Sequence, residues 1–123
     1  MERWLTQPLL NCPPDYLIQL AYYRRWTKQT DSALEVTALI ERPDAQVIFN
    51  RREIAVLATE RAAALMDKYE KDGVGLDQAL QFLKYHHKLL DGKSDEHNFN
   101  AWRRYNSICE RKIQQGTMRR GKS

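Results

Sequence analysis

The stretch NRREIAVLATERAAALMDKYEKDGVG, residues 50–75, decides the fold of this chain. Asn50 and Glu53 have the spacing of a capping box, in which each side chain accepts a hydrogen bond from the backbone of the other residue. Behind Glu53, apolar residues recur every three or four positions, which places them on one face of a helix of about five turns. These residues are Ile54, Leu57, Ala58, Ala62, Leu65, Met66 and Tyr69. Glycines at 73 and 75 follow Asp72 and end the predicted helix.

Two further helices are predicted before this stretch. The first runs from Pro14 to about Lys28, because proline is tolerated in a first turn and Asp15 suits the positive end of the helix dipole. The second begins with an N-cap among residues 30–32 and ends before Pro43, which cannot continue a helix.

Two helices are also predicted after the central stretch. One carries Leu76, Ala79, Leu80, Leu83 and Leu90, and Gly92 closes it. The last helix starts at residues 94–96 and ends at Gly116. Its apolar stripe consists of Phe99, Trp102, Tyr105, Cys109 and Ile113.

These segments predict an all-α fold, a single compact bundle of about five helices. Residues 46–49 are the one segment compatible with a strand, and they have no partner strand in the sequence. No internal repeat or linker divides the chain. We therefore expect one helical domain over residues 1–116, followed by a basic tail over residues 117–123.

Composition places the chain among globular proteins. Of its 123 residues, 42% are hydrophobic and 29% are charged, which is enough for a modest core. No apolar run approaches the roughly 18 residues that a membrane span requires. The two cysteines, Cys12 and Cys109, form no CxxC pair, so we expect a cytoplasmic protein without a disulfide framework.

No motif in the sequence predicts catalysis or metal binding. His87 and Asp91 lie on one face of a helix, but two ligands do not make a zinc site. Ser32 and Ser94 have the positions of helix caps, and Cys109 lies on an apolar stripe. We expect no catalytic residues, no metal, no cofactor and no enzymatic activity.

Charge is distributed very unevenly along the chain. Residues 103–123 contain seven bases and one acid, a net charge of +6, whereas the other 102 residues contain 13 bases and 15 acids, a net charge of −2. A cationic end on a near-neutral protein favours an anionic partner, and nucleic acid is the commonest one. The other interpretation is a solvated tail that aids solubility.

Basic residues interleaved with aromatic ones are the candidate nucleic-acid contacts, because arginine binds phosphate with two parallel hydrogen bonds and aromatic rings stack on bases. Arg104 and Arg111 share a helix face, which Arg103 flanks. Trp102 and Tyr105 are expected in the core, with base stacking as the alternative. The candidate residues are Arg24, Arg25, Lys28, Arg51, Arg52, Arg103, Arg104, Arg111, Lys112, Arg119 and Arg120.

Two segments also resemble a known family. Residues 62–68 (AAALMDK), a glycine-bearing break and residues 78–85 (QALQFLKY) are similar to the helical C-terminal region of the type I-D CRISPR large subunit. The helix over 100–112, with its Arg-Arg pair, falls where that region has its last helix. The chain thus resembles the small subunit of a type I-D CRISPR interference complex.

The resemblance implies a non-enzymatic role in an antiviral ribonucleoprotein complex. Several copies would line the complex beside its repeated backbone subunits and its large subunit. They would brace the duplex of CRISPR RNA and target DNA, and the displaced strand, through phosphate contacts. The competing interpretation is a helical protein–protein adaptor, or a phage or plasmid accessory factor, that does not bind nucleic acid.

Overall fold

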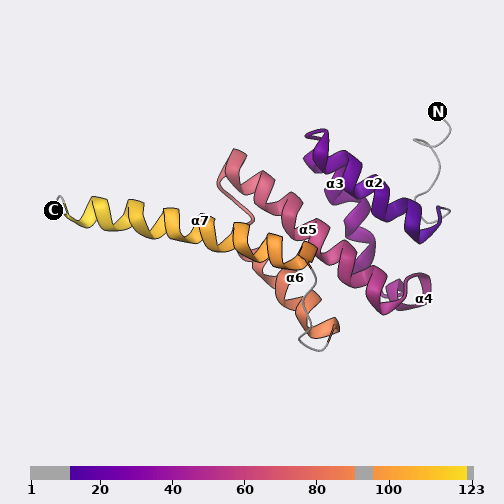
Figure 1. Ribbon diagram of the computed structural model, residues 1–123. Coiled ribbons are helices and arrows are strands. Elements are labelled where there is room, and N and C mark those ends of the chain that lie inside the picture. Colours follow the sequence, from indigo (N-terminus) through magenta and orange to yellow (C-terminus); the bar gives the residue numbers. More distant parts are fainter. Residues whose placement is uncertain (1–11, 91–95, 122–123) are drawn as a thin grey trace.

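The computed structural model of the protein describes residues 12–90 and 96–121. Over these ranges all regular structure is helical and no strand forms, which confirms the predicted all-α bundle (Figure 1). None of the helices in this part is long and apolar enough to cross a membrane. In chain order the elements are α2 (Pro14–Trp26), α3 (Thr30–Thr37), the 3₁₀ helix η2 (Ala38–Glu41), α4 (Ala45–Ile48), α5 (Arg51–Asp72), α6 (Leu76–Leu89) and α7 (Glu96–Gly121).

Helix α5 is the axis of the bundle. It contacts α2, α3, α4, α6 and α7, and Figure 1 shows it passing between the N-terminal helices and the α6–α7 pair. The sequence predicted one apolar face, but the burial is broader. The residues buried on α5 include Thr59, Glu60 and Ala63, which lie outside the predicted stripe. Helices pack on several sides of α5, so most of its circumference between residues 54 and 66 is withdrawn from water.

Both ends of α5 are formed as the sequence predicted. The Glu53 backbone N–H donates to Asn50 Oδ1 at 2.8 Å, and the Asn50 backbone N–H donates to Glu53 Oε1 at 2.8 Å, which completes the capping box. Gly73 ends the helix with a left-handed φ of +78°, and its N–H donates to the Tyr69 carbonyl at 2.7 Å. The chain then turns back, and α6 packs along α5.

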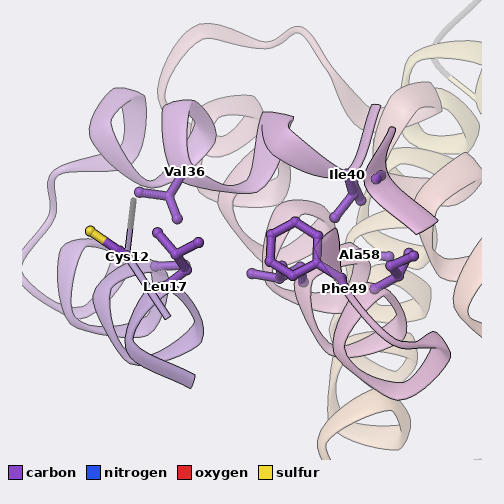
Figure 2. Packing of buried hydrophobic residues seen from close by; sticks show 10 residues of the cluster. Cys12, Leu17, Val36, Ile40, Phe49 and Ala58 are labelled. Atoms are coloured by element: carbon purple, nitrogen blue, oxygen red, sulfur yellow. The ribbon is translucent and has the colours of Figure 1, made fainter. Parts of the chain in front are cut away.

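One cluster of apolar side chains fills the space among α2, α3, α4 and α5. Leu17, Val36, Phe49 and Ala58 are at most 2% exposed and gather between these helices (Figure 2). Residues 46–49, the sole strand candidate, form most of α4 and the residue that follows it; Phe49 belongs to this cluster and Ile48 packs against it, whereas Val47 is 88% exposed. A lone strand would leave its backbone groups unpaired, whereas a helical turn satisfies them locally.

A second cluster joins α5, α6 and α7. From α6 it takes the predicted residues Leu76, Ala79 and Leu83, and from α7 it takes Ala101 and Ile108. The prediction for α6 is therefore largely confirmed, although Leu80 and Leu90 are only partly buried and His86, which was not predicted, is fully buried. The predicted closing residue Gly92 and the predicted capping residues 94 and 95 lie outside the described residues.

The packing face of α7 differs from the predicted stripe. Asn98, Ala101 and Ile108 are buried, whereas Phe99 is 56% exposed and Ile113 is 67% exposed. The three other predicted residues, Trp102, Tyr105 and Cys109, are partly buried at the edge of the second cluster. Phe99 lies about 100° around the helix from Asn98, so it points to the side of the contact. Ile113 lies beyond the buried part of the helix.

The predicted end of α7 at Gly116 is wrong, because the helix continues to Gly121. A glycine inside a helix costs about 1 kcal/mol relative to alanine, and it ends a helix only where the backbone turns left-handed. The predicted basic tail over residues 117–123 is therefore helical as far as Gly121. In Figure 1 this C-terminal part of α7 runs away from the bundle.

Two isoleucines on the same helix test the corrected packing face. We expect Ile108→Ala to lower the free energy of unfolding by about 2–4 kcal/mol, because the side chain is 2% exposed and its removal leaves a cavity. Ile113→Ala, at a position that is 67% exposed, should change it by less than about 0.5 kcal/mol. Urea denaturation followed by circular dichroism measures both. Equal losses of unfolding free energy in the two variants would show that Ile113 is packed against the bundle, as the predicted stripe required.

Candidate nucleic-acid interface

One side of α7 forms a shallow hollow lined by hydrogen-bond donors. Its lining residues recur at helical spacing and include three guanidinium groups: Asn100, Arg103, Arg104, Ser107 and Arg111. Guanidinium groups pair with phosphate oxygens through two parallel hydrogen bonds, and amide and hydroxyl groups add single bonds. The composition of this hollow suits an oxyanion such as phosphate.

The Arg104 side chain connects α7 to α5. Its Nη2 atom lies 2.5 Å from Asp67 Oδ1 and 3.2 Å from Glu70 Oε2, and Nη1 donates to the Ala63 carbonyl at 3.4 Å. The Arg104 side chain is 29% exposed. The sequence placed this arginine on a face available to a partner, but its position against α5 makes it a bridge within the fold.

Among the α7 side chains that the structure describes, three cations face water: Arg103, Arg111 and Lys112. Arg103 is exposed, and its guanidinium carbon lies 6.0 Å from the centre of the Phe99 ring. Arg111 Nη2 lies 3.4 Å from Glu70 Oε1, yet its side chain remains 61% exposed, and such surface ion pairs are weak. The Lys112 ammonium lies 5.7 Å from the centre of the Tyr69 ring. These three residues can exchange water for phosphate at little cost to the fold.

Arg119 and Arg120 belong to the last turn of α7. The helix carries their backbone into the part that runs away from the bundle (Figure 1). Their side chains lie outside the described part of the structure, so their predicted role stays a prediction.

Arg25, at the end of α2, forms an ion pair inside the fold. Its Nε atom lies 2.9 Å from Glu60 Oε2 of α5, and the two side chains are 16% and 3% exposed. The Arg25 guanidinium also lies 5.6 Å from the centre of the Tyr22 ring and 6.0 Å from the centre of the Trp26 ring. A charge as deeply buried as Glu60 requires a partner, and Arg25 supplies it. The sequence analysis did not identify Glu60. An acidic residue within the apolar segment of a helix indicates a buried charge that needs a partner.

The other two candidates on the N-terminal side also have local roles. Arg24 Nη1 donates to the Ser32 carbonyl at 3.1 Å, which ties α2 to α3. Lys28 is exposed just after α2, with a left-handed φ of +66°. It lines a hollow with acidic residues that include Asp67 and Asp72. Its surroundings therefore favour cations over phosphate.

Arg51 and Arg52 are exposed in the first turn of α5. Asp67, to which Arg104 binds, lies 16 residues further along the same helix, a distance of roughly 24 Å. The structure therefore does not bring this pair together with the α7 arginines. The eleven candidates form three separate groups, and in the α7 group the exposed Arg103 and Arg111 line the same hollow.

A second basic surface lies between α6 and α7, and the sequence analysis did not predict it. A hollow there is lined by Lys84, His87 and Lys88 of α6 and by Trp102 of α7. The spacing of the three α6 residues, which places them on one helix face, was a signal for it. Trp102, expected in the core, is only partly buried and lies at the edge of this hollow.

Among the described residues, no group of three or more His, Cys, Asp or Glu side chains is arranged to hold a metal ion. Asp91, the second residue of the weak zinc pattern, lies outside the described residues. Comparison of the chain with protein-family models, with curated proteins and with solved structures gave no match.

Adjacent arginines on α7 provide a matched test of these roles. We expect Arg104→Ala to lower the free energy of unfolding by about 1–2 kcal/mol, because Asp67 loses its charged partner. Arg103→Ala should change it by less than about 0.5 kcal/mol, since that side chain is exposed. Thermal and urea denaturation of both variants measure the difference. Equal stability of the two would show that the bridge from α7 to α5 contributes nothing.

Proposed function

We propose that this protein is a non-catalytic nucleic-acid-binding subunit that contacts the phosphate backbone through α7. The observation that carries the proposal is the exposed basic side of this helix, where Arg103 and Arg111 line one hollow; Lys112 is exposed on another side of the helix. It belongs to a segment, residues 103–123, with a net charge of +6. The end of α7 extends beyond the bundle, where a long polyanion has access to it (Figure 1).

Binding of this kind depends on charge and not on base sequence. Arg103 and Arg111 are eight residues apart, about 12 Å along the helix axis, and phosphates follow one another every 3.4 Å or so along one strand of a B-form duplex. Both arginines can therefore contact one strand, several phosphates apart. Each contact releases condensed counterions, and this release drives association and makes it sensitive to salt.

The internal ion pairs limit the strength of this interaction. Arg25 and Arg104 hold helices together, and Glu70 lies beside Arg111. The candidate cations therefore do not all contribute to binding. We expect weak, sequence-tolerant association that gains strength when several copies act together.

The more specific proposal is membership of an RNA-guided CRISPR interference complex, and it rests on the resemblance of residues 62–68, 78–85 and 100–112. In such a complex base pairing supplies sequence specificity, while this subunit supplies charge and shape. Its remaining surface would contact protein neighbours. On α2, Tyr22, Tyr23 and Trp26 are 44%, 61% and 62% exposed, and residues of these types are enriched in protein interfaces.

The same aromatic residues favour the second candidate function, a helical protein–protein adaptor. An adaptor would use the α2 surface to bind its partner, and the cations of α7 would remain solvated. Salt-dependent binding to nucleic acid separates the two functions, because an adaptor has no reason to show it.

Charge reversal on α7 tests nucleic-acid binding. We expect Arg103→Glu/Arg111→Glu to weaken binding to a single-stranded oligonucleotide at least tenfold in low salt, with an unchanged far-UV spectrum. The slope of log affinity against log salt should fall by about 1.4, since each single-strand phosphate contact contributes about 0.7. Fluorescence anisotropy at several salt concentrations provides the measurement.

The matched control is Arg42→Glu/Lys71→Glu, which reverses the same number of charges at exposed positions that do not line the hollow on α7. It should bind almost as well as the wild type. An equal loss in both double variants would show that net charge alone matters, and no binding by the wild type at low salt would favour the adaptor.

Membership of the complex has a separate test. When the tagged chain is expressed together with the other subunits and the guide RNA of a type I-D system, we expect it to co-purify with the backbone subunits and the RNA. The Arg103→Glu/Arg111→Glu variant should be recovered with less RNA. A protein that binds oligonucleotides but is recovered without RNA or other subunits would refute the complex assignment alone.

A further inference from the structure

The hollow between α6 and α7 combines three basic side chains with one aromatic ring. Lys84, His87 and Lys88 lie three and four residues apart, so they form one face of α6, and Trp102 of α7 lies opposite them. The hollow has a volume of ≈ 440 Å³, which is ample for one nucleotide.

Among the residues that the structure describes, those that line this hollow include no Asp or Glu. The opposite flank of α7 differs, because there Asp67 and Glu70 pair with Arg104. Lys84 and Lys88 are both exposed, so the α6 flank presents two ammonium groups that an anionic ligand can reach.

The ring of Trp102 is held in a defined orientation. It meets Tyr105 edge to face, with ring centroids 6.1 Å apart and planes at 83°, and it packs against the second apolar cluster. Because Trp102 is only partly buried and lines the hollow, part of the indole remains available to a ligand. A fixed aromatic ring beside cations is the arrangement that single-strand binding proteins use for bases and their phosphates.

We propose that this hollow binds one unpaired nucleotide of a single strand, with its base stacked on Trp102 and its phosphate held by Lys84 and Lys88. This inference rests on the proposed function and specifies its ligand. A base within a duplex is covered on both faces by its neighbours, so stacking on Trp102 selects single-stranded over double-stranded nucleic acid. Arg103 follows Trp102 on α7, so a strand held by the α7 cations can continue into the hollow.

Tryptophan fluorescence provides the first test. The chain has three tryptophans, and Trp4→Phe/Trp26→Phe leaves Trp102 as the single indole. We expect a single-stranded oligothymidylate to quench its emission in a saturable way, and a duplex of equal length to quench it far less. The matched control, Trp4→Phe/Trp102→Phe, retains Trp26 on α2 and should show no quenching.

Removal of two cations provides the second test. Lys84→Gln/Lys88→Gln should weaken binding of the oligothymidylate roughly tenfold and lower the salt slope by about 0.7, because the contact to one phosphate is lost. Both lysines are exposed, so the fold should be unaffected. Lys68→Gln/Lys71→Gln, which removes two lysines from a hollow that contains acids, should bind as the wild type does.

Each alternative outcome overturns the inference in a recognisable way. If Arg103→Glu/Arg111→Glu abolishes binding while Trp102 emission and the Lys84→Gln/Lys88→Gln affinity stay unchanged, the hollow is not a site and the proposed function stands. Equal quenching by single strand and duplex refutes selection of an unpaired base. Quenching by polyglutamate alone identifies an acidic protein partner. Absence of any oligonucleotide binding by the wild type removes both proposals.

Discussion

Burial of α5 along most of its circumference is the constraint on which the rest of the structure depends. A surface helix has to bury one face, but residues 54–66 of α5 need neighbours on several sides at once. Helices α2, α3, α6 and α7 fill those sides. The alanines at 62–64 are fully or almost fully buried and add little bulk, so neighbouring helices can approach closely. The position of every other helix is thus defined relative to α5.

Such burial has a consequence for the polar residues of α5. Glu60 is paired with Arg25 of α2, and Arg61 Nη1 donates to the Leu34 carbonyl of α3 at 2.8 Å. Burial lowers the pKa of the Arg61 guanidinium, while the charge of Glu41 acts in the opposite direction. Because desolvation offsets much of the attraction in buried ion pairs, we infer that these bonds fix the orientation of α2 and α3 more than they add net stability.

The cations on and around α7 are of two kinds: some bridge helices and others face water. Its first half packs on α5 and α6, and its C-terminal part extends beyond them (Figure 1). On the α5 flank, Asp67 and Glu70 bind Arg104, whereas on the α6 flank Lys84 and Lys88 lie beside Trp102 without acids among the residues that line the hollow. A helix that is anchored on one side and basic on another can hold a polyanion without disturbing the core.

The sequence alone determined the five longer helices and several of their ends, because these depend on neighbouring residues; α4 and η2 were not predicted. The capping box at Asn50 and Glu53 and the left-handed Gly73 are local backbone features, and the structure confirms them. Gly116 shows where local reasoning fails: a glycine permits a helix to end but does not require it.

Only the tertiary structure decided which side of each helix meets a neighbour. The period of a helix shows that residues share a face, but the choice of face depends on segments distant in sequence. Phe99 therefore lies exposed while Asn98 is buried. Arg103 and Arg104 are identical in type and adjacent in sequence, yet a rotation of about 100° places one in water and the other against Asp67. The hollow beside Trp102 arises in the same way, because its residues come from two helices that meet only in the folded chain.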